Sequence, residues 1–177
     1  MTSEAERVEH LIDDITAEVI EAATLDEALD AITVALRERY QLWRSSIWTF
    51  EPPDAARLIA AWSIGDTAFE PGVVVRFSLT DDVEFLATSV MAGKPMMMRT
   101  SERDLGLLTD MLKREGIASA VIVPVGRNRK EPIGLLALAS SAPDVFKAGD
   151  VRFVAALART LSHPLTSLVE SALPRSA

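Results

Sequence analysis

Two nearly continuous apolar runs, at residues 118–125 and 132–140, constrain the fold of this chain more than any other feature. A strand that is apolar at almost every position is covered on both faces, so it lies in the middle of a sheet. The polar, basic segment between the runs, centred on Asn128, is typical of an exposed hairpin turn. The sequence therefore predicts a sheet with these two strands in its interior.

Two helices are predicted ahead of the first strand. Apolar residues recur at three- and four-residue steps over residues 4–23, which is the spacing of one helix face. A second stripe of the same kind runs over residues 25–40. Thr24 precedes it as a capping residue, and Glu27 stands three positions later, as in a capping box.

A long terminal helix is predicted over residues 147–173. Its apolar residues alternate at three and four positions, close to the rhythm of a coiled-coil seam. Pro164 lies inside this helix and removes one backbone hydrogen bond. We therefore expect a kink or a local break near Leu161.

The middle of the chain alternates strand and helix signals. Strands are predicted over residues 45–50, 58–63, 73–79 and 94–99, and helices over residues 80–92 and 101–115. Gly93 and Gly116 follow these helices, where a left-handed residue commonly ends a helix. A chain of 177 residues, 49% of them hydrophobic, is expected to build one domain around one core.

The chain contains no cysteine. This excludes disulfide frameworks, thiolate nucleophiles, cysteine-ligated zinc and thioether-linked chromophores. The two histidines, His10 and His163, are far apart in the sequence and are expected to be exposed on helices, so no metal site is predicted. The sequence also holds no Ser-His-Asp arrangement and no glycine-rich phosphate loop.

Acidic residues outnumber basic ones by 26 to 18, and the basic residues are scattered. An electrostatic footprint for nucleic acid is therefore missing. The polar, acidic N-terminus has no signal-peptide core, and no apolar run approaches the roughly 20 residues that span a bilayer. We expect a cytoplasmic protein that contacts neither nucleic acid nor a membrane.

Three stretches of the chain match a known family residue by residue. They are Gly93-Lys94-Pro95 with the methionines 96–98, Gly116-Ile117-Ala118-Ser119 with Val123-Pro124-Val125 and the strand 133–138, and Phe146 with Asp150 at the entry to the terminal helix, followed by Leu157-Ala158. In this order they resemble the GAF domain family from Leu25 to Val169. The resemblance implies an α/β (α+β) fold with a central antiparallel sheet of about six strands. The terminal helices would pack on one face, and short helices and loops would form a ligand pocket on the other.

The resemblance also implies how the chain is divided. Residues 1–24 would form an amphipathic signalling helix, residues 25–170 the GAF domain with its long terminal helix, and residues 171–177 a tail. Methionine sulfoxide reductases resemble this fold but depend on cysteines, which are absent here. The signature of the cyclic-nucleotide-binding members cannot be placed in residues 101–115. Neither an enzymatic activity nor a cofactor is therefore predicted.

Apolar residues in the segments that wall the pocket of GAF relatives are the candidate ligand contacts. They are Trp48, Trp62, Phe69, Phe77, Phe85, Met96, Met98 and Met111, with Ser63, Thr88 and Arg99 as polar anchors. A mostly apolar site with few polar anchors suits a hydrophobic or aromatic ligand. The alternative is that these side chains simply close the core. Because their strands are predicted to pair, Trp48 and Trp62 are also placed to pack on each other.

Two apolar seams at the ends of the chain suggest a homodimer. They comprise Val8, Ile12, Ile15 and Val19 on the first helix and Val151, Ala158, Leu161 and Leu165 on the last. The preferred function is a regulatory sensor that binds an unknown small molecule and signals through dimeric helices to an output domain or protein. The alternatives are a ligand-free dimerisation or protein-interaction module and a cofactor-binding redox or light sensor.

Overall fold

A six-stranded antiparallel sheet organises the chain in a computed structural model, which describes residues 3–51, 55–64, 70–76, 88–102, 107–128 and 130–173. The strands are β1 (Leu42–Glu51), β2 (Ala55–Ser63), β3 (Val74–Arg76), β4 (Met96–Arg99), β5 (Ser119–Val125) and β6 (Gly134–Ser140). Their order across the sheet is β3-β2-β1-β6-β5-β4. The two apolar runs therefore lie in the interior of the sheet, as predicted.

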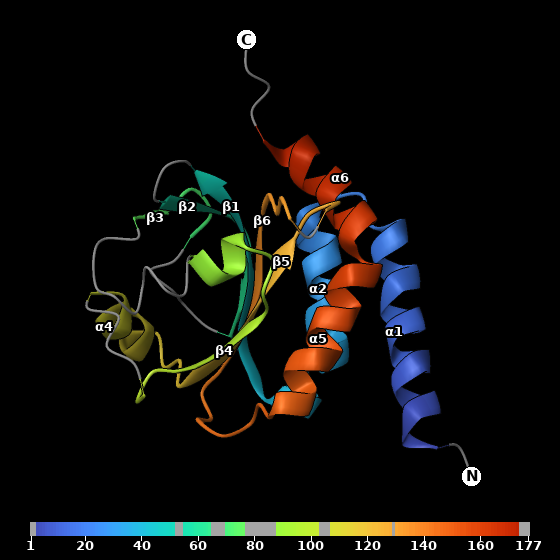
Figure 1. The fold of residues 1–177 in the computed structure, drawn as a ribbon, viewed down its shortest axis with the longest axis horizontal. Helices are drawn as coiled ribbons and strands as arrows, with labels where there is room; N and C mark the ends of the chain where they lie inside the picture. Colours follow the sequence, from blue (N-terminus) through green and yellow to red (C-terminus); the bar gives the residue numbers. More distant parts are fainter. Residues whose placement is uncertain are drawn as a thin grey trace.

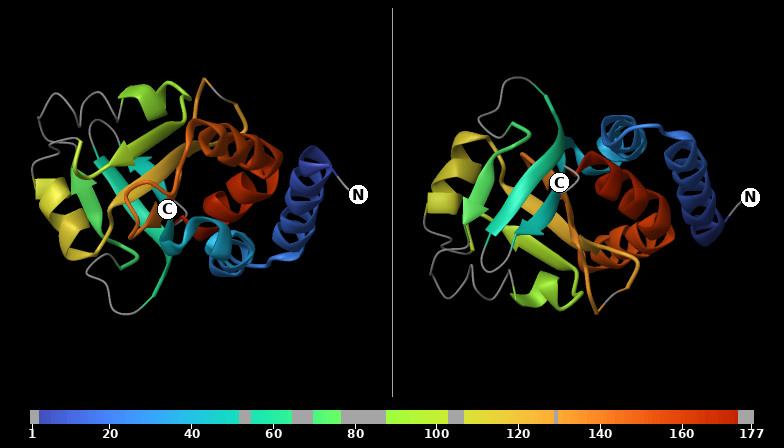
Figure 2. Two further views of the ribbon diagram at one scale, coloured as in Figure 1. Left: turned by 90° about the horizontal axis from the view of Figure 1, so that it is seen from below. Right: turned by 90° about the horizontal axis from the view of Figure 1, so that it is seen from above.

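Helices cover the sheet on both sides (Figure 1). On one face lie α1 (Glu4–Glu21), α2 (Leu25–Tyr40), α5 (Ala148–Thr160) and α6 (Ser162–Ala172), and on the other lies α4 (Leu107–Arg114). Figure 2 shows that α1 is outermost, so that α2 and α5 stand between it and the sheet. This arrangement confirms the predicted fold class, including the terminal helices packed on one face.

The main core fills the space between the sheet and the four helices. Its buried residues come from the sheet and from all four helices, and they include Ile15, Val19, Leu29, Ile32, Leu36, Val121, Val123, Leu136, Leu138, Val154, Leu157, Leu161 and Leu165. A second, smaller cluster lies on the other face of the sheet, around Val90, Met98, Ile122 and Leu135. The sheet therefore separates two apolar clusters, as expected for strands that are apolar on both faces.

Thr24 caps the second helix as predicted, whereas the carboxylate of Glu27 bonds to the residue before the cap and not to Thr24 as in a capping box. The backbone N–H of Glu27 donates to Thr24 Oγ1 at 3.2 Å, and the Glu27 carboxylate accepts from the backbone N–H of Ala23 at 2.7 Å. The first helix has a capping box of its own, formed by Ser3 and Glu6, which the sequence analysis did not identify. These contacts satisfy backbone donors that a helix start leaves without intrahelical partners.

The terminal helix breaks where Pro164 predicts it. It divides into α5 and α6 at Leu161, whose backbone torsions are −82° and −2°. Lys147 holds the N-cap position of α5, and Asp150 lies three residues later. The Asp150 carboxylate reaches back from the third helical position and accepts the Lys147 backbone N–H at 2.8 Å.

Several elements differ from the predicted ranges. β1 and β2 each begin three residues earlier than predicted, and β4 begins at Met96. The longer strands follow from pairing, since polar residues such as Arg44 and Ser45 are held in β1 by partners on β6 and β2. Gly93 and Gly116 have φ values of 78° and 72°, as predicted for helix ends. Residues 77–79 of the third predicted strand and most of the helix predicted over residues 80–92 lie outside the described residues.

Tyr40 joins the end of α2 to the start of α5. Its hydroxyl donates to Asp150 Oδ1 at 3.0 Å, and its ring lies 5.2 Å from that of the buried Phe146. Burial disfavours the charged phenolate, and the neighbouring Asp150 carboxylate adds to this effect, which together raise the pKa of Tyr40 to about 12. The protonated phenol is therefore part of the folded structure.

Gly134 lets β6 approach β1 closely. A Cβ atom at this position would overlap the carbonyl oxygen of Trp48. Gly134 pairs with Thr49 on β1 and with Val125 on β5, so it sits between two strands at the start of β6. No side chain fits there unless the backbone of β1 moves.

We predict that the effect of Tyr40→Phe on stability depends on pH. Near pH 8 the variant loses the hydrogen bond to Asp150 and is less stable by about 1 kcal/mol. Between pH 10 and 12 the unfolded wild type loses its phenol proton while the folded protein keeps it, so wild-type stability falls as the pH rises. The variant has no phenol to titrate, so the difference in the free energy of unfolding between the two proteins becomes smaller as the pH rises. Urea unfolding of both proteins from pH 8 to 11 measures it, and a constant gap would contradict the pKa shift.

We also predict that Gly134→Ala lowers the free energy of unfolding by more than about 2 kcal/mol, because the backbone of β1 must move. Gly149→Ala is the matched control. Its new Cβ atom would meet nothing closer than 3.9 Å, and it lies in the first turn of α5, where alanine is the better helix former. Urea unfolding of the two variants should show a large loss for the first and none for the second.

Candidate ligand-binding site

A hollow of about 110 Å³ lies on the face of the sheet opposite α1, α2, α5 and α6. It is lined by Arg44, Ser46, Trp48, Ala56, Val75, Met98, Leu112, Ile117, Ala120, Ile122, Leu135, Ala137 and Ala139. Most of these side chains are apolar, and many belong to the smaller of the two core clusters. An apolar hollow with a few polar groups is the usual form of a small-molecule site.

Strand alternation explains why these residues meet. Side chains two positions apart point to the same face of a sheet, so Arg44, Ser46 and Trp48 of β1 face the hollow together. On the neighbouring β6, Ala137 lies opposite Ser46. The small side chains of Ala137 and Ala139 leave the space that larger residues would fill.

Arg44 is the charged residue of this site. It is only 3% exposed although it lies among apolar neighbours on an interior strand. Burial lowers the pKa of its guanidinium, and the negative charge of Glu115 acts in the opposite direction. The buried guanidinium still stays protonated, because the ordinary pKa of arginine is so high. The guanidinium also interacts with other groups of the chain, and it places a positive charge at the wall of the hollow.

Trp48 has a fixed orientation in this wall. Its indole Nε1 donates a hydrogen bond to Ser46 Oγ at 2.9 Å. The bond satisfies the one polar group of the indole and leaves its ring as apolar surface. The hollow therefore combines an oriented aromatic ring, a buried cation and small alanines.

The predicted ligand contacts divide between the two faces of the sheet. Trp48 and Met98 line the hollow, and Met96 packs beside them in the same cluster. Trp62 lies on the opposite face, where it packs on the main core with the guanidinium of Arg37 5.6 Å from its ring centroid. The expectation that the two tryptophans pack on each other is therefore wrong. Trp62 pairs with Ser45, which lies three positions from Trp48 on β1, so side-chain alternation turns the two tryptophans to different faces.

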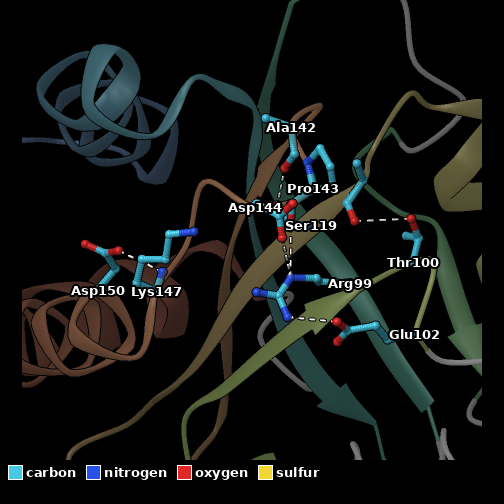
Figure 3. A network of polar contacts seen from close by, with 10 residues as sticks. Arg99, Thr100, Glu102, Ser119, Ala142, Pro143, Asp144, Lys147 and Asp150 are labelled. Carbon is cyan, nitrogen blue, oxygen red and sulfur yellow. Dashed lines mark hydrogen bonds and ion pairs between the residues drawn. The ribbon is translucent and has the colours of Figure 1, made fainter.

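Arg99 lies at the end of β4 and does not line the hollow (Figure 3). Its Nε donates to the carbonyl of Pro143 at 3.1 Å and lies 3.3 Å from Asp144 Oδ1, while Nη1 pairs with Glu102 at 2.9 Å. The nearby Ser119 hydroxyl donates to the Ala142 carbonyl at 2.6 Å. These contacts tie β4 and β5 to the loop that leads into α5, so Arg99 already has structural partners.

The remaining predicted ligand contacts do not line the hollow or lie outside the described residues. Phe69, Phe77 and Phe85 lie outside the described residues, as does the side chain of Met111. Ser63 is half-buried at the end of β2, and Thr88 is exposed at the start of a short helical turn. Their role as ligand contacts stays a prediction.

The residues proposed for the dimer helices are mostly used inside one chain. Ile15, Val19, Ala158, Leu161 and Leu165 are buried in the main core, Ile12 and Val151 pack against it, and Val8 is half-buried. The apolar side chains of these two seams are therefore needed for packing within one chain, because α1 forms an additional layer over α2, α5 and α6. The large exposed apolar side chains on the helical side are Ile20 of α1 and Val34 of α2, at 64% and 63% exposure.

Sequence reasoning missed Arg44, Ser46 and the alanines of β6. Arg44 carried a signal, since it is a charged residue directly before the strand predicted over residues 45–50. The early start of β1 brought it inside the sheet. The alanines carried no signal of their own, because an alanine in an apolar run reads only as core.

Among the described residues, no group of three or more His, Asp or Glu side chains is placed to hold a metal ion. Both histidines are exposed on their helices, as predicted. The described helices include none with the length and apolar character needed to cross a bilayer.

The antiparallel sheet, with four helices on one face and a hollow on the other, defines the class of small α+β domains. A family model described as GAF domain matches residues 22–163, which is most of the chain. The chain belongs to the GAF domain family. Domains of this family act in sensing and regulation and bind small molecules. No curated protein is similar enough in sequence to count as a match.

Solved structures show the same fold at low sequence identity. A far-red-absorbing protein in its dark state with bound biliverdin IXa has a TM-score of 0.70 and 14% identity, covering 90% of this chain and 99% of that one. The GAF domain of an Acinetobacter phosphoenolpyruvate-protein phosphotransferase has a TM-score of 0.70 and 15% identity, and the match covers 97% of this chain and 98% of that one. The GAF domain of a Bacillus halodurans two-component sensor histidine kinase has a TM-score of 0.65 and 12% identity, and the match covers 86% of this chain and 100% of that one.

We predict that the hollow accepts a larger side chain where the main core does not. Ala137→Leu places an isobutyl group in the hollow and should change the free energy of unfolding by less than about 1 kcal/mol. Ala60→Leu is the control, since Ala60 is buried in the main core of the same sheet and overpacking there costs about 1–3 kcal/mol. Urea unfolding of both variants measures the difference. Equal losses would mean that the hollow is as closely packed as the core.

Proposed function

We propose that this chain is a sensory domain that binds a small, mostly apolar molecule in the hollow beside Arg44 and reports its presence through the helices on the other face of the sheet. The observation that carries the proposal is a hollow with a buried guanidinium in its wall. A buried cation beside apolar surface favours a ligand with an anionic or strongly polar group on an apolar body.

The size of the hollow sets the size of the ligand. Drug-sized ligands occupy pockets of about 300–1,000 Å³, whereas a dry cavity of about 150 Å³ is enough for benzene. At about 110 Å³ the hollow suits a molecule no larger than one aromatic ring. This argues against an extended cofactor in the same place.

The sheet supplies the route from ligand to helices. Leu135 faces the hollow, while the next residue, Leu136, packs in the main core. Val121 and Val123 alternate in the same way with Ala120 and Ile122 on β5. A ligand that shifts these strands therefore changes the surface on which α2 and α5 pack, because close-packed interiors transmit displacement.

We further infer that the domain acts by binding and not by catalysis, and without a cofactor. The exposed positions of His10 and His163 leave them remote from the hollow, and a chain without cysteine has no thiol chemistry to offer. A light or redox sensor is less well supported. The biliverdin of the far-red-absorbing neighbour is far larger than this hollow, and a thioether link is impossible here.

A second candidate function is a dimerisation or protein-interaction module without a small ligand. The exposed Ile20 of α1 and Val34 of α2 favour it, because large apolar side chains in water are common at contact surfaces. A homodimer would then use this outer surface of α1 and α2 instead of the predicted seams. The cytoplasmic location, the division at residues 24 and 170 and an output domain or partner protein remain part of the proposal.

Native mass spectrometry of the purified protein tests both functions at once. For the sensor we expect a dimer with the extra mass of a small molecule, and loss of that mass in Ala137→Leu, whose side chain occupies the hollow. The dimer should persist in Ala137→Leu and should weaken in Ile20→Ser, which changes only an exposed residue. A dimer without extra mass would support the interaction module. A monomer without extra mass would contradict both proposals.

A further inference from the structure

A second concave surface lies on the helical side of the sheet. It is a groove of about 560 Å³ between the hairpin that joins β5 to β6, the turn before β4 and the outer face of α5. Its floor includes Val123 and Ala158, which belong to the main core and not to the cluster around the hollow. The groove is therefore separated from the hollow by the sheet.

The charge of this groove is opposite to that of the chain. The protein has a formal net charge of −8, yet the described residues that line the groove include Arg127, Arg152 and Arg159 and no acidic residue. A concave surface lined by charges of one sign focuses the field and attracts ions of the other sign. The site therefore selects anions.

The helix sets the spacing of two of these arginines. Arg152 and Arg159 are seven residues apart on α5, which puts them on one face about 10 Å apart along the axis. Ala155 lies between them and also lines the groove, so its small side chain leaves the space between the two guanidinium groups open. An anion in the groove lies within reach of both.

The third arginine comes from the opposite side. Arg127 leaves the hairpin and is held by an ion pair with Glu170 of α6 at 2.8 Å. Within the ranges that the structure describes, Arg152 and Arg159 have no ion pair. Arg127 is therefore partly neutralised, while the two arginines of α5 retain their full charge for a ligand.

We propose that this groove binds a small organic anion with a phosphate group or several carboxylates. Guanidinium groups pair with phosphate and carboxylate oxygens through two parallel hydrogen bonds, and several of them together favour a multiply charged ligand. The volume lies within the range of small-molecule sites. The apolar floor, with Val123 and Ala155, contacts the uncharged part of the molecule. Three guanidinium groups that line one space of about 560 Å³ suit a single multiply charged molecule better than an extended acidic peptide.

A bound anion would lie close to the break between α5 and α6. Ser162, the first residue of α6, also lines it, next to the break at Leu161. An anion that bridges the hairpin and α5 therefore fixes the first of two helices that meet at this break. This role is independent of the ligand proposed for the hollow.

Isothermal titration calorimetry at constant ionic strength tests the proposal, with pyrophosphate and citrate as probes. We expect saturable binding of one anion per chain, weakened about tenfold by Arg152→Gln and by Arg159→Gln. Arg7→Gln is the matched control, because it removes the same charge from an exposed position on α1 and should leave affinity unchanged. These residues are exposed on helices, so the fold is expected to persist, and circular dichroism checks it.

Three results would overturn the proposal. The first is an absence of binding by either probe at millimolar concentration. The second is equal weakening by Arg7→Gln, which would show that the anions respond only to overall charge. The third is tighter binding of a hexaglutamate peptide than of either probe, which would assign the groove to an acidic protein segment.

Discussion

The pairing of β1 with β6 supports the rest of the structure, because it joins the two halves of the chain at the centre of the sheet. Every backbone donor and acceptor along these strands needs a partner, and neither strand is at an edge. Gly134 makes the close approach of β6 to Trp48 possible. Once these strands are paired, their alternating side chains supply both the main core under the helices and the wall of the hollow on the other face.

The two faces of the sheet have different chemistry. Toward the helices, the core is closely packed and carries α1 as an outer layer, tied together by contacts such as the one between Tyr40 and Asp150. Toward the hollow, the small side chains of Ala137 and Ala139 leave space beside the buried guanidinium of Arg44. The guanidinium of Arg44, only 3% exposed, places a positive charge at the wall of the hollow. This difference between the two faces is the basis on which we propose that the hollow side binds a ligand.

The helix α5 lies between the two surfaces that we propose bind ligands. α5 packs on β5, whose opposite face borders the hollow, and the outer surface of α5 forms one wall of the arginine groove. A small apolar molecule on one side and an anion on the other would therefore act on the same helix without contacting each other. The break between α5 and α6 at Leu161 lies where such effects would meet.

The sequence by itself determined the elements and their order. The apolar runs of β5 and β6, the cap formed by Thr24 and Glu27 and the break caused by Pro164 are local properties of neighbouring residues, so periodicity and backbone chemistry were enough to predict them. The tertiary structure decided which residues share a face. Strand register turned Trp62 away from Trp48, the early start of β1 buried Arg44, and the layer of α1 over α2 and α5 used the seams predicted for a dimer. It also gathered Arg127 with Arg152 and Arg159, which are distant in sequence. These outcomes depend on contacts between distant segments, and a one-residue change of register exchanges the faces of a strand, so no local pattern encodes them.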